Sequence, residues 1–256
     1  MLRWRSATAL VLAPIALGAI ALGRWAVFAL VFLVIGIAAY ELSQALKPLP
    51  FLAALGAGSF PVVLSIPYGL AGILAGALLS LPWALFWLAG KPDIRTLRAV
   101  LAVLLIALWV GAPLAHLGLF PRSRYGVILI LIAVVGPWVS DSGAYFGGRL
   151  FGRHLLFPSL SPNKTVEGSL GGLLSTVLII GFVSYEFLDF TLAKAAVIGA
   201  GVSIFSQSGD LFESSLKRIL DVKDLGYFLP GHGGILDRVD SLLFTAPAVY
   251  YLFLLV

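Results

Sequence analysis

The sequence predicts an all-α, polytopic integral membrane protein with about nine transmembrane helices. Hydrophobic residues make up 60% of the 256 residues and charged residues only 11%, whereas soluble domains average about 45–50% and about 25%. The mean hydropathy is +1.04. Apolar runs long enough to cross a bilayer core of about 30 Å recur along the chain. So few charged side chains cannot coat a water-soluble globule, and that class is excluded.

Each predicted span is a run without charged residues, because an unpaired charge is costly in the hydrocarbon core. One of these runs, 48–90, is long enough for two helices, and Ser65-Ile66-Pro67-Tyr68-Gly69 within it predicts a tight turn. Counting that run twice gives nine spans. The runs cover residues 6–23, 25–40, 48–90, 99–121, 125–140, 168–185, 195–209 and 241–256.

The distribution of Lys and Arg predicts which loops face the cytoplasm. With the N-terminus in the cytoplasm, 13 of the 17 basic residues lie on that side, as the positive-inside rule expects. The polar segments 141–167 and 210–240 are then cytoplasmic loops, and in a bacterium the protein would lie in the inner membrane. This bias also explains the net charge of +5, so no nucleic-acid partner is expected. The four basic residues outside are Arg24, Arg122, Arg124 and Lys194.

The start of the chain allows two interpretations, and the distribution of acidic residues suggests how the chain is organised. Arg3 and Arg5 before an apolar run also fit a cleavable signal peptide, but a second span begins at Trp25, which favours an uncleaved helical hairpin. We expect one membrane domain, 1–256, with an N-terminal helical scaffold (1–140) and a catalytic portion with cytoplasmic loops (141–256). Ten of the 12 acidic residues lie in the latter, and only Glu41 and Asp93 precede it.

The first motif is acidic and continues an apolar run. Asp210, Glu213 and Lys217 stand at i, i+3 and i+7, which places them on one face of a helix. They form a buried ion pair, a solvated helix end, or a site for a hard cation such as Mg²⁺, which prefers carboxylate oxygens and substrate phosphates. The chain has no cysteine, so any metal must bind oxygen or one of the three histidines, and these histidines lack a zinc-binding spacing.

The second motif joins a glycine-rich loop to another acidic pair. Asp237 and Asp240 open the last span at i, i+3, so two helices could hold a metal between them. Backbone N–H groups of the preceding loop could approach phosphate, with His232 as a loop hydrogen-bond partner, a base or a ligand. Residues expected to contribute to this phosphate cradle are Lys217, Arg218, Lys223, His232, Gly233, Gly234 and Arg238.

The third motif combines glycines, hydroxyls and basic residues in the predicted loop 141–167. These are Asp141-Ser142-Gly143-Ala144-Tyr145-Phe146-Gly147-Gly148-Arg149 and Ser161-Pro162-Asn163-Lys164-Thr165-Val166-Glu167-Gly168. Such residues suit an anion-binding surface. The spacings Gly143-x-x-x-Gly147 and Gly168-x-x-x-Gly172 fit close helix packing equally well.

Residues 141–241 resemble the phosphatidate cytidylyltransferase (CDP-diacylglycerol synthase) family. The resemblance rests on the stretch from Ser214 to Arg218, on Lys223-Asp224-Leu225-Gly226, and on Leu229-Pro230-Gly231-His232-Gly233-Gly234-Ile235-Leu236-Asp237-Arg238-Val239-Asp240. The upstream segments resemble the family's D-[ST]-G-A-Y-F-x-G-R and S-P-K-K-T-x-E-G. Asn163 stands where many members have lysine, which leaves Lys164 as the remaining phosphate contact.

The resemblance implies transfer of the cytidylyl group of CTP to phosphatidate, which yields CDP-diacylglycerol and pyrophosphate. It also implies a homodimer, Mg²⁺ bound by Asp210 and Asp237, and a monovalent cation such as K⁺ beside the Mg²⁺. From the residues we expect Glu213 and Asp240 to support the metal. We further expect Asp141 and Ser142 to contact nucleotide or metal, and the basic residues to pair with phosphates. Those basic residues are Arg149, Lys164, Lys217, Arg218, Lys223 and Arg238.

Three other functions fit parts of the pattern. A CTP-dependent polyprenol or phytol kinase would transfer the γ-phosphoryl group instead. A CDP-alcohol phosphotransferase would need a D-G-x-x-A-R motif, which Asp237-Arg238-Val239-Asp240 lacks. A transporter would place charges near the midplane of paired repeats, whereas here they cluster near predicted loops.

Overall fold

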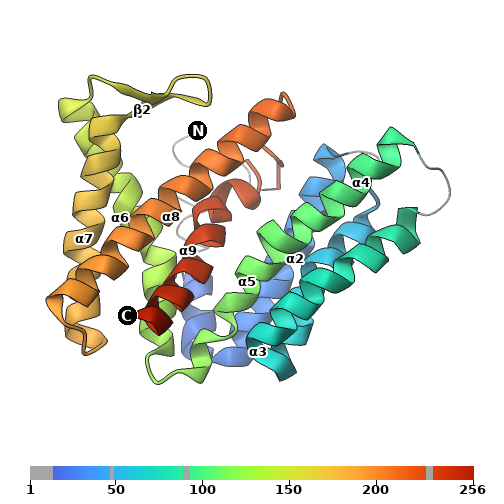
Figure 1. Cartoon of the computed structure of the whole chain (residues 1–256), viewed down its shortest axis with the longest axis horizontal. Helices are drawn as coiled ribbons and strands as arrows, with labels where there is room; N and C mark the ends of the chain where they lie inside the picture. Colours follow the sequence, from blue (N-terminus) through green and yellow to red (C-terminus); the bar gives the residue numbers. More distant parts are fainter. Residues whose placement is uncertain (1–13, 47–48, 89–92, 229–232) are drawn as a thin grey trace. The chain divides into compact units, whose positions relative to one another are not determined.

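A computed structural model describes residues 14–46, 49–88, 93–228 and 233–256, and it confirms the polytopic all-α membrane class (Figure 1). Within these residues, seven helical stretches are long and apolar enough to span a membrane. The predicted span 6–23 lies partly outside the described residues, so the count of nine stays a prediction. The spans are α2 (Arg24–Ala45), α3 (Phe51–Leu88), α4 (Ile94–Leu105) with η1 (Ile106–Gly111), α5 (Ala112–Leu117) and η2 (Phe120–Arg122), α6 (Gly126–Phe151), α7 (Val166–Phe187), α8 (Leu192–Ile219) and α9 (Leu236–Leu255).

The chain forms two compact units. One comprises Met1–Arg122 and Asp224–Arg238, and the other Ser123–Lys223 and Val239–Val256. Each unit therefore includes residues from both predicted portions of the chain. The expected single membrane domain, divided at residue 140, stays a prediction.

In the first unit, α3 is a helical hairpin. Gly69 has φ 60° and ψ −131°, a conformation that glycine adopts readily, and the chain reverses there. The Trp83 indole N–H then donates to the Ala53 carbonyl at 3.2 Å. The prediction of two helices joined by a turn in this run is confirmed. Arg24 and Arg122 donate to backbone carbonyls of residues 65 and 66 beside this turn.

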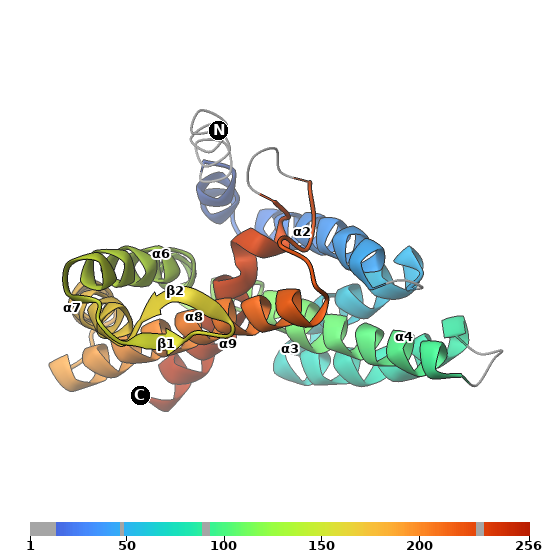
Figure 2. The same ribbon diagram turned by 90° about the horizontal axis from the view of Figure 1, so that it is seen from above.

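The second unit contains α6, α7, α8, most of α9 and a β-hairpin. Helix α7 packs against both α6 and α8. Thr165 and Thr191 cap α7 and α8, because each side chain accepts a backbone N–H of the first helical turn. Strands β1 (Leu155–Phe157) and β2 (Ser161–Thr165) pair antiparallel, and Figure 2 shows the hairpin near the ends of α6 and α7.

Two predicted loops are partly helical. Segment 141–167 begins with the last turns of α6 and then forms the β-hairpin, which was not predicted. Segment 210–240 begins with the last ten residues of α8 and ends with the first five of α9. The helical start of 141–167 was not predicted, because each predicted span ends at the first charged residue. The helical ends of 210–240 agree with the spacing of Asp210, Glu213 and Lys217 and of Asp237 and Asp240. A helix can continue beyond a charged residue and out of the bilayer, because its backbone hydrogen bonds are made within the helix in lipid and in water alike.

The packing within the α3 hairpin predicts that valine substitutions at two glycines of the first unit affect protein stability differently. A Cβ on Gly72 would lie 1.9 Å from the Leu64 carbonyl oxygen, whereas a Cβ on Gly36 would meet nothing within 4 Å. Gly72→Val should therefore lower the free energy of unfolding by about 1–3 kcal/mol or prevent folding. Gly36→Val, the matched control, should change it little. Thermal unfolding in detergent measures both, and equal midpoints for the two variants would contradict the hairpin packing.

Candidate active site

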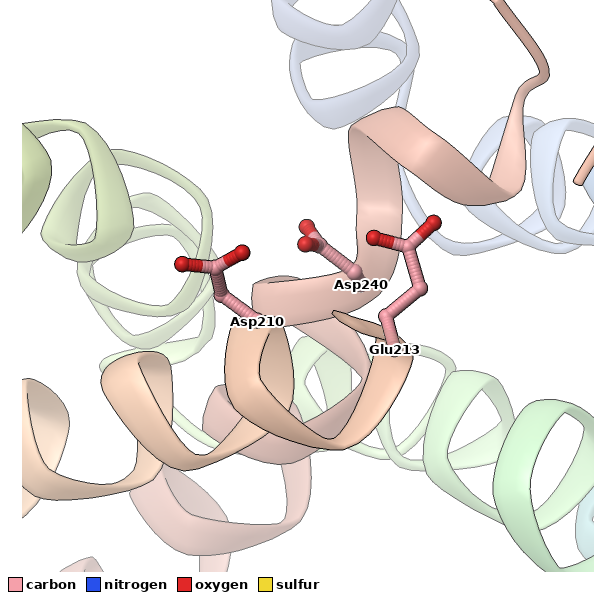
Figure 3. Close-up of side chains that lie close together, drawn as sticks. All are labelled: Asp210, Glu213 and Asp240. Atoms are coloured by element: carbon pink, nitrogen blue, oxygen red, sulfur yellow. The ribbon is translucent and has the colours of Figure 1, made fainter. Parts of the chain in front are cut away.

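Three carboxylates gather at the polar end of α8. Asp210 and Glu213 come from α8 and Asp240 from α9, and one oxygen from each lies within 4.8 Å of the others. Figure 3 shows the Asp240 carboxylate between those of Asp210 and Glu213. Glu213 is almost fully buried, at 1% exposed. The predicted common face of α8 is confirmed, and the structure places Asp240 with it.

A close approach of two helices makes this cluster possible. A Cβ on Gly209 would lie 2.7 Å from the Asp240 carbonyl oxygen and 3.0 Å from the Ser241 Cα, so α8 and α9 touch through backbone at this point. Only glycine permits such contact. On α9, the Thr245 hydroxyl donates to the Ala133 carbonyl of α6 at 2.9 Å. These contacts place Asp240 of α9 beside Asp210 of α8.

Two ammonium groups flank the three carboxylates. Lys217 Nζ donates to Glu213 Oε2 at 3.0 Å within α8, and Lys164 of β2 forms an ion pair with Asp210. Burial lowers the pKa of the Lys164 ammonium, and the nearby carboxylates of Asp141, Asp240 and Glu213 oppose that shift. The site therefore combines both signs of charge in a partly dehydrated place, which suits binding of a metal together with phosphate.

The β-hairpin brings Lys164 to this place. Glu167 closes the base of the hairpin, because its Oε2 accepts the backbone N–H groups of Arg153 and His154 at 3.0 and 3.2 Å. Its Oε1 lies 2.6 Å from His154 Nδ1. Toward the tip of the hairpin, Arg218 Nε of α8 donates to the Leu160 carbonyl at 3.4 Å. Contacts at both ends thus hold the strand that carries Lys164.

A cavity of about 410 Å³ adjoins the Lys164–Asp210 pair. Its walls come from α6, the hairpin, α7 and α8, all within the second unit. Four predicted site residues line it together, although they are up to 69 positions apart in the sequence: Asp141, Arg149, Lys164 and Asp210. The carboxylates and cations in its wall fit a phosphorylated ligand.

Two polar residues that line this cavity, Ser169 and Gln207, were not predicted. The Gln207 amide donates to Ser203 Oγ at 2.9 Å and to the Ser169 carbonyl at 3.2 Å, and its oxygen accepts from the Ser169 hydroxyl. Ser203 Oγ in turn lies 3.1 Å from Ser140 Oγ. This network ties α6, α7 and α8 together beneath the cavity. The available signal was a glutamine between two serines, one turn before Asp210.

The glycines of the third motif serve helix packing. A Cβ on Gly143 would lie 2.7 Å from the Gly171 carbonyl oxygen, and a Cβ on Gly168 would lie 2.8 Å from that of Ala144. Helices α6 and α7 therefore touch backbone to backbone. Of the two readings of these spacings, close packing is confirmed, while Gly148 and Gly168 also line the cavity.

The acidic pair of α9 is divided between two environments. While Asp240 joins the cluster, Asp237 accepts the backbone N–H groups of Gly234 at 2.6 Å and Leu225 at 3.4 Å. Gly233, with φ 79°, places its Cα so that a Cβ would lie 2.8 Å from Asp237 Oδ2. The described residues of the glycine loop thus contact the Asp237 carboxylate, and a metal-binding role for Asp237 stays a prediction.

The remaining predicted residues lie at exposed positions or outside the described residues. Ser142 and Arg149 are exposed on α6, where Arg149 donates to the Tyr145 hydroxyl at 2.9 Å. Arg218, Lys223 and Arg238 are also exposed, and their role in phosphate binding stays a prediction. His232 lies outside the described residues.

A further buried carboxylate, that of Glu41 in α2, is not among the predicted site residues. It is 2% exposed and accepts the backbone N–H groups of Ile235 and Leu236, at the start of α9. Its isolation in the first predicted half was the available signal, because an acidic residue at membrane depth is rare without a partner.

The cavity predicts a contrast in chemical labelling, which the absence of cysteine makes easy to measure. A thiol at Ala144, which lines the cavity, should react with a water-soluble maleimide at least about tenfold faster than one at Ala133, which is fully buried on the same helix. Ala144→Cys and Ala133→Cys, each in the otherwise cysteine-free protein, are compared in detergent. Equal rates would mean that the cavity does not admit aqueous reagents.

Comparison with known proteins identifies the family. The profile of the cytidylyltransferase family matches residues 3–256. Over 131 residues the chain is 49% identical to proteins named phosphatidate cytidylyltransferase from Staphylococcus saprophyticus and from Bacillus subtilis. The alignments cover 50% of this chain and 50% of the first relative, and 51% and 49% for the second. The chain thus spans about half the length of the curated relatives it matches. Because the family profile extends over nearly the whole chain, this protein belongs to the cytidylyltransferase family.

Proposed function

We propose that the protein transfers the cytidylyl group of CTP to phosphatidate and releases pyrophosphate. The observation that carries this proposal is the cluster of Asp210, Glu213 and Asp240, flanked by two lysines beside a cavity at the polar end of apolar helices. The family match and the names of the relatives support the same reaction.

The reaction needs little acid–base help from the protein. An oxygen of the phosphatidate phosphomonoester attacks the α-phosphorus of CTP, and a new P–O bond forms as the α–β anhydride bond breaks. The bond electrons leave with pyrophosphate. The second pKa of such a phosphate is about 6, so the nucleophile is largely ionised near neutral pH. The task of the protein is to bring two polyanions together and to hold them in line.

The donor set of the cluster fits Mg²⁺. Three carboxylate oxygens within 4.8 Å of one another are hard ligands, and a phosphorylated substrate would complete the coordination. Asp210, Glu213 and Asp240 would hold the ion, with Asp237 as a further candidate from the resemblance. When bound, the ion would neutralise phosphate charge and favour departure of pyrophosphate. A monovalent cation such as K⁺ beside it is proposed on the resemblance alone.

The basic residues would bind the phosphates of the two substrates. Lys164 and Lys217 already lie among the carboxylates, so each could exchange a carboxylate oxygen for a phosphate oxygen without a large movement. Arg149 lines the same cavity. Exposed Arg218, Lys223 and Arg238 would meet CTP or pyrophosphate from water.

The proposal also covers membrane placement and assembly. Phosphatidate stays in the bilayer because transfer of its acyl chains to water is costly, so its head group would enter the site from the leaflet while CTP enters from water. We propose that the N-terminus and the site face the cytoplasm, as the basic residues indicate, and that the protein acts as a homodimer, as the resemblance implies.

An assay with labelled CTP tests the proposed reaction. With purified protein, phosphatidate, Mg²⁺ and CTP labelled at the α-phosphate, we expect the label in a chloroform-soluble product together with free pyrophosphate. Label that stays in water as CDP would indicate γ-phosphoryl transfer or hydrolysis and would overturn the proposal. Turnover that is absent while the protein is monodisperse would do the same, and uptake in proteoliposomes would then favour a transporter.

Removal of one carboxylate should weaken metal binding. Asp240→Asn should raise the dissociation constant for Mn²⁺, used as a spectroscopic probe, by about ten- to a hundredfold, because one of three charged ligands is lost. Asp221→Asn is the matched control, since Asp221 is exposed and its φ of 52° suits asparagine. Electron paramagnetic resonance counts free Mn²⁺ in both.

The same titration decides the role of Asp237. Weaker Mn²⁺ binding in Asp237→Asn would place this residue among the ligands, and unchanged binding would remove it. Wild-type affinity in Asp240→Asn would instead contradict the three-carboxylate site.

A further inference from the structure

The carboxylate of Glu41 lies in the first unit, far along the sequence from the residues it contacts. Its Oε1 accepts the Ile235 N–H at 2.9 Å and its Oε2 accepts the Leu236 N–H at 3.2 Å, across 194 and 195 positions. Those are the N–H groups at the start of α9, which lack partners within the helix. Glu41 therefore does for α9 what a capping residue normally does from the adjacent chain, and its negative charge also suits the positive end of the helix dipole.

Two glycines near the start of α9 lie directly against this carboxylate, with no room for a side chain. A Cβ on Gly226 would lie 2.3 Å from Glu41 Cδ, and a Cβ on Gly234 would lie 2.6 Å from Glu41 Oε2. A side chain at either position would displace Glu41. The loop thus needs glycine here because its backbone closes around a buried carboxylate.

Asp237 holds the same loop from the other side. It accepts the N–H groups of Gly234 and Leu225, so the loop is bound by two carboxylates at once. Helix α9, whose first turn is fixed in this way, carries both Asp237 and Asp240. A change in how α9 begins would alter the direction of the Asp237 side chain.

We propose that Glu41 is a positioning residue, which fixes the start of α9 and the backbone at Gly226 and Gly234, and thereby the carboxylate of Asp237. This inference rests on the proposed function for its catalytic consequence, but not for the contact itself. Glu41 touches no reacting atom in this proposal and acts through backbone N–H groups.

Hydrogen exchange measured on the full-length protein tests the contact. Glu41→Gln keeps the shape of the side chain but replaces one acceptor oxygen by an NH₂ group. The amides of Ile235 and Leu236 should then exchange about ten- to a hundredfold faster, as expected when hydrogen bonds to a charged group are lost. Glu186→Gln, which alters an exposed glutamate on α7, is the matched control and should leave these amides unchanged.

A spin label provides a second readout that does not depend on turnover. Tyr227 is 85% exposed and next to Gly226, so a nitroxide on Tyr227→Cys in the cysteine-free chain reports motion of the loop. We expect greater mobility with Glu41→Gln than with Glu186→Gln. Should Glu41→Gln not fold, Glu41→Asp, which keeps the charge but is one methylene shorter, replaces it and should show a smaller change in the same direction.

Kinetics separate positioning from loss of folded protein. Per molecule of folded protein, Glu41→Gln should lower kcat about tenfold or more with KM for CTP within about twofold, and Glu41→Asp should recover part of that loss. Unchanged exchange and label mobility in Glu41→Gln would overturn the inference. A wild-type protein without cytidylyl transfer would overturn the proposed function but leave the exchange result to decide the role of Glu41.

Discussion

Burial of carboxylates among apolar helices is the constraint on which the site depends. A buried carboxylate is costly unless donors or cations surround it, and this chain supplies both kinds of partner. Glu213 has Lys217, Asp210 has Lys164, and Glu41 has the two N–H groups that begin α9. Each acidic residue therefore has to be placed together with its partner. In the first unit this restricts how α2 meets the start of α9, and in the second how α8 meets the hairpin.

Close backbone contact provides the room for these pairs. Where α8 meets α9 and where α6 meets α7, glycine removes the side chain that would separate the helices. Without a hydrophobic driving force between helices in lipid, such contacts and polar bonds between helices hold a membrane protein together. The half-buried Gln207 and its network across α6, α7 and α8 contribute the polar part.

Three features of the fold and site could be predicted from hydropathy and residue spacing alone. The membrane class, the turn in 48–90 and the shared face of Asp210, Glu213 and Lys217 follow from local spacing, and the structure confirms them. Spacing alone could not tell which acidic residue of α9 faces α8, because Asp237 and Asp240 are both at the start of the helix. The hairpin was missed because its strands are short and Glu167 and Arg218 hold them by contacts outside the strands. The partner of Glu41 was beyond reach, since no pattern within a helix points to a loop 194 positions away.

That separation has a consequence for biosynthesis. A ribosome that adds about 5–20 residues per second needs about 10–40 seconds to travel from Glu41 to Ile235. Throughout that interval α2 is in the membrane while the two amides that will surround its carboxylate have not been made. The glutamate must be satisfied by water, lipid head groups or a proton until translation reaches the start of α9. Completion of the first unit therefore has to wait for the synthesis of residues 235 and 236, and a chain truncated before residue 235 would keep the Glu41 carboxylate without these two donors.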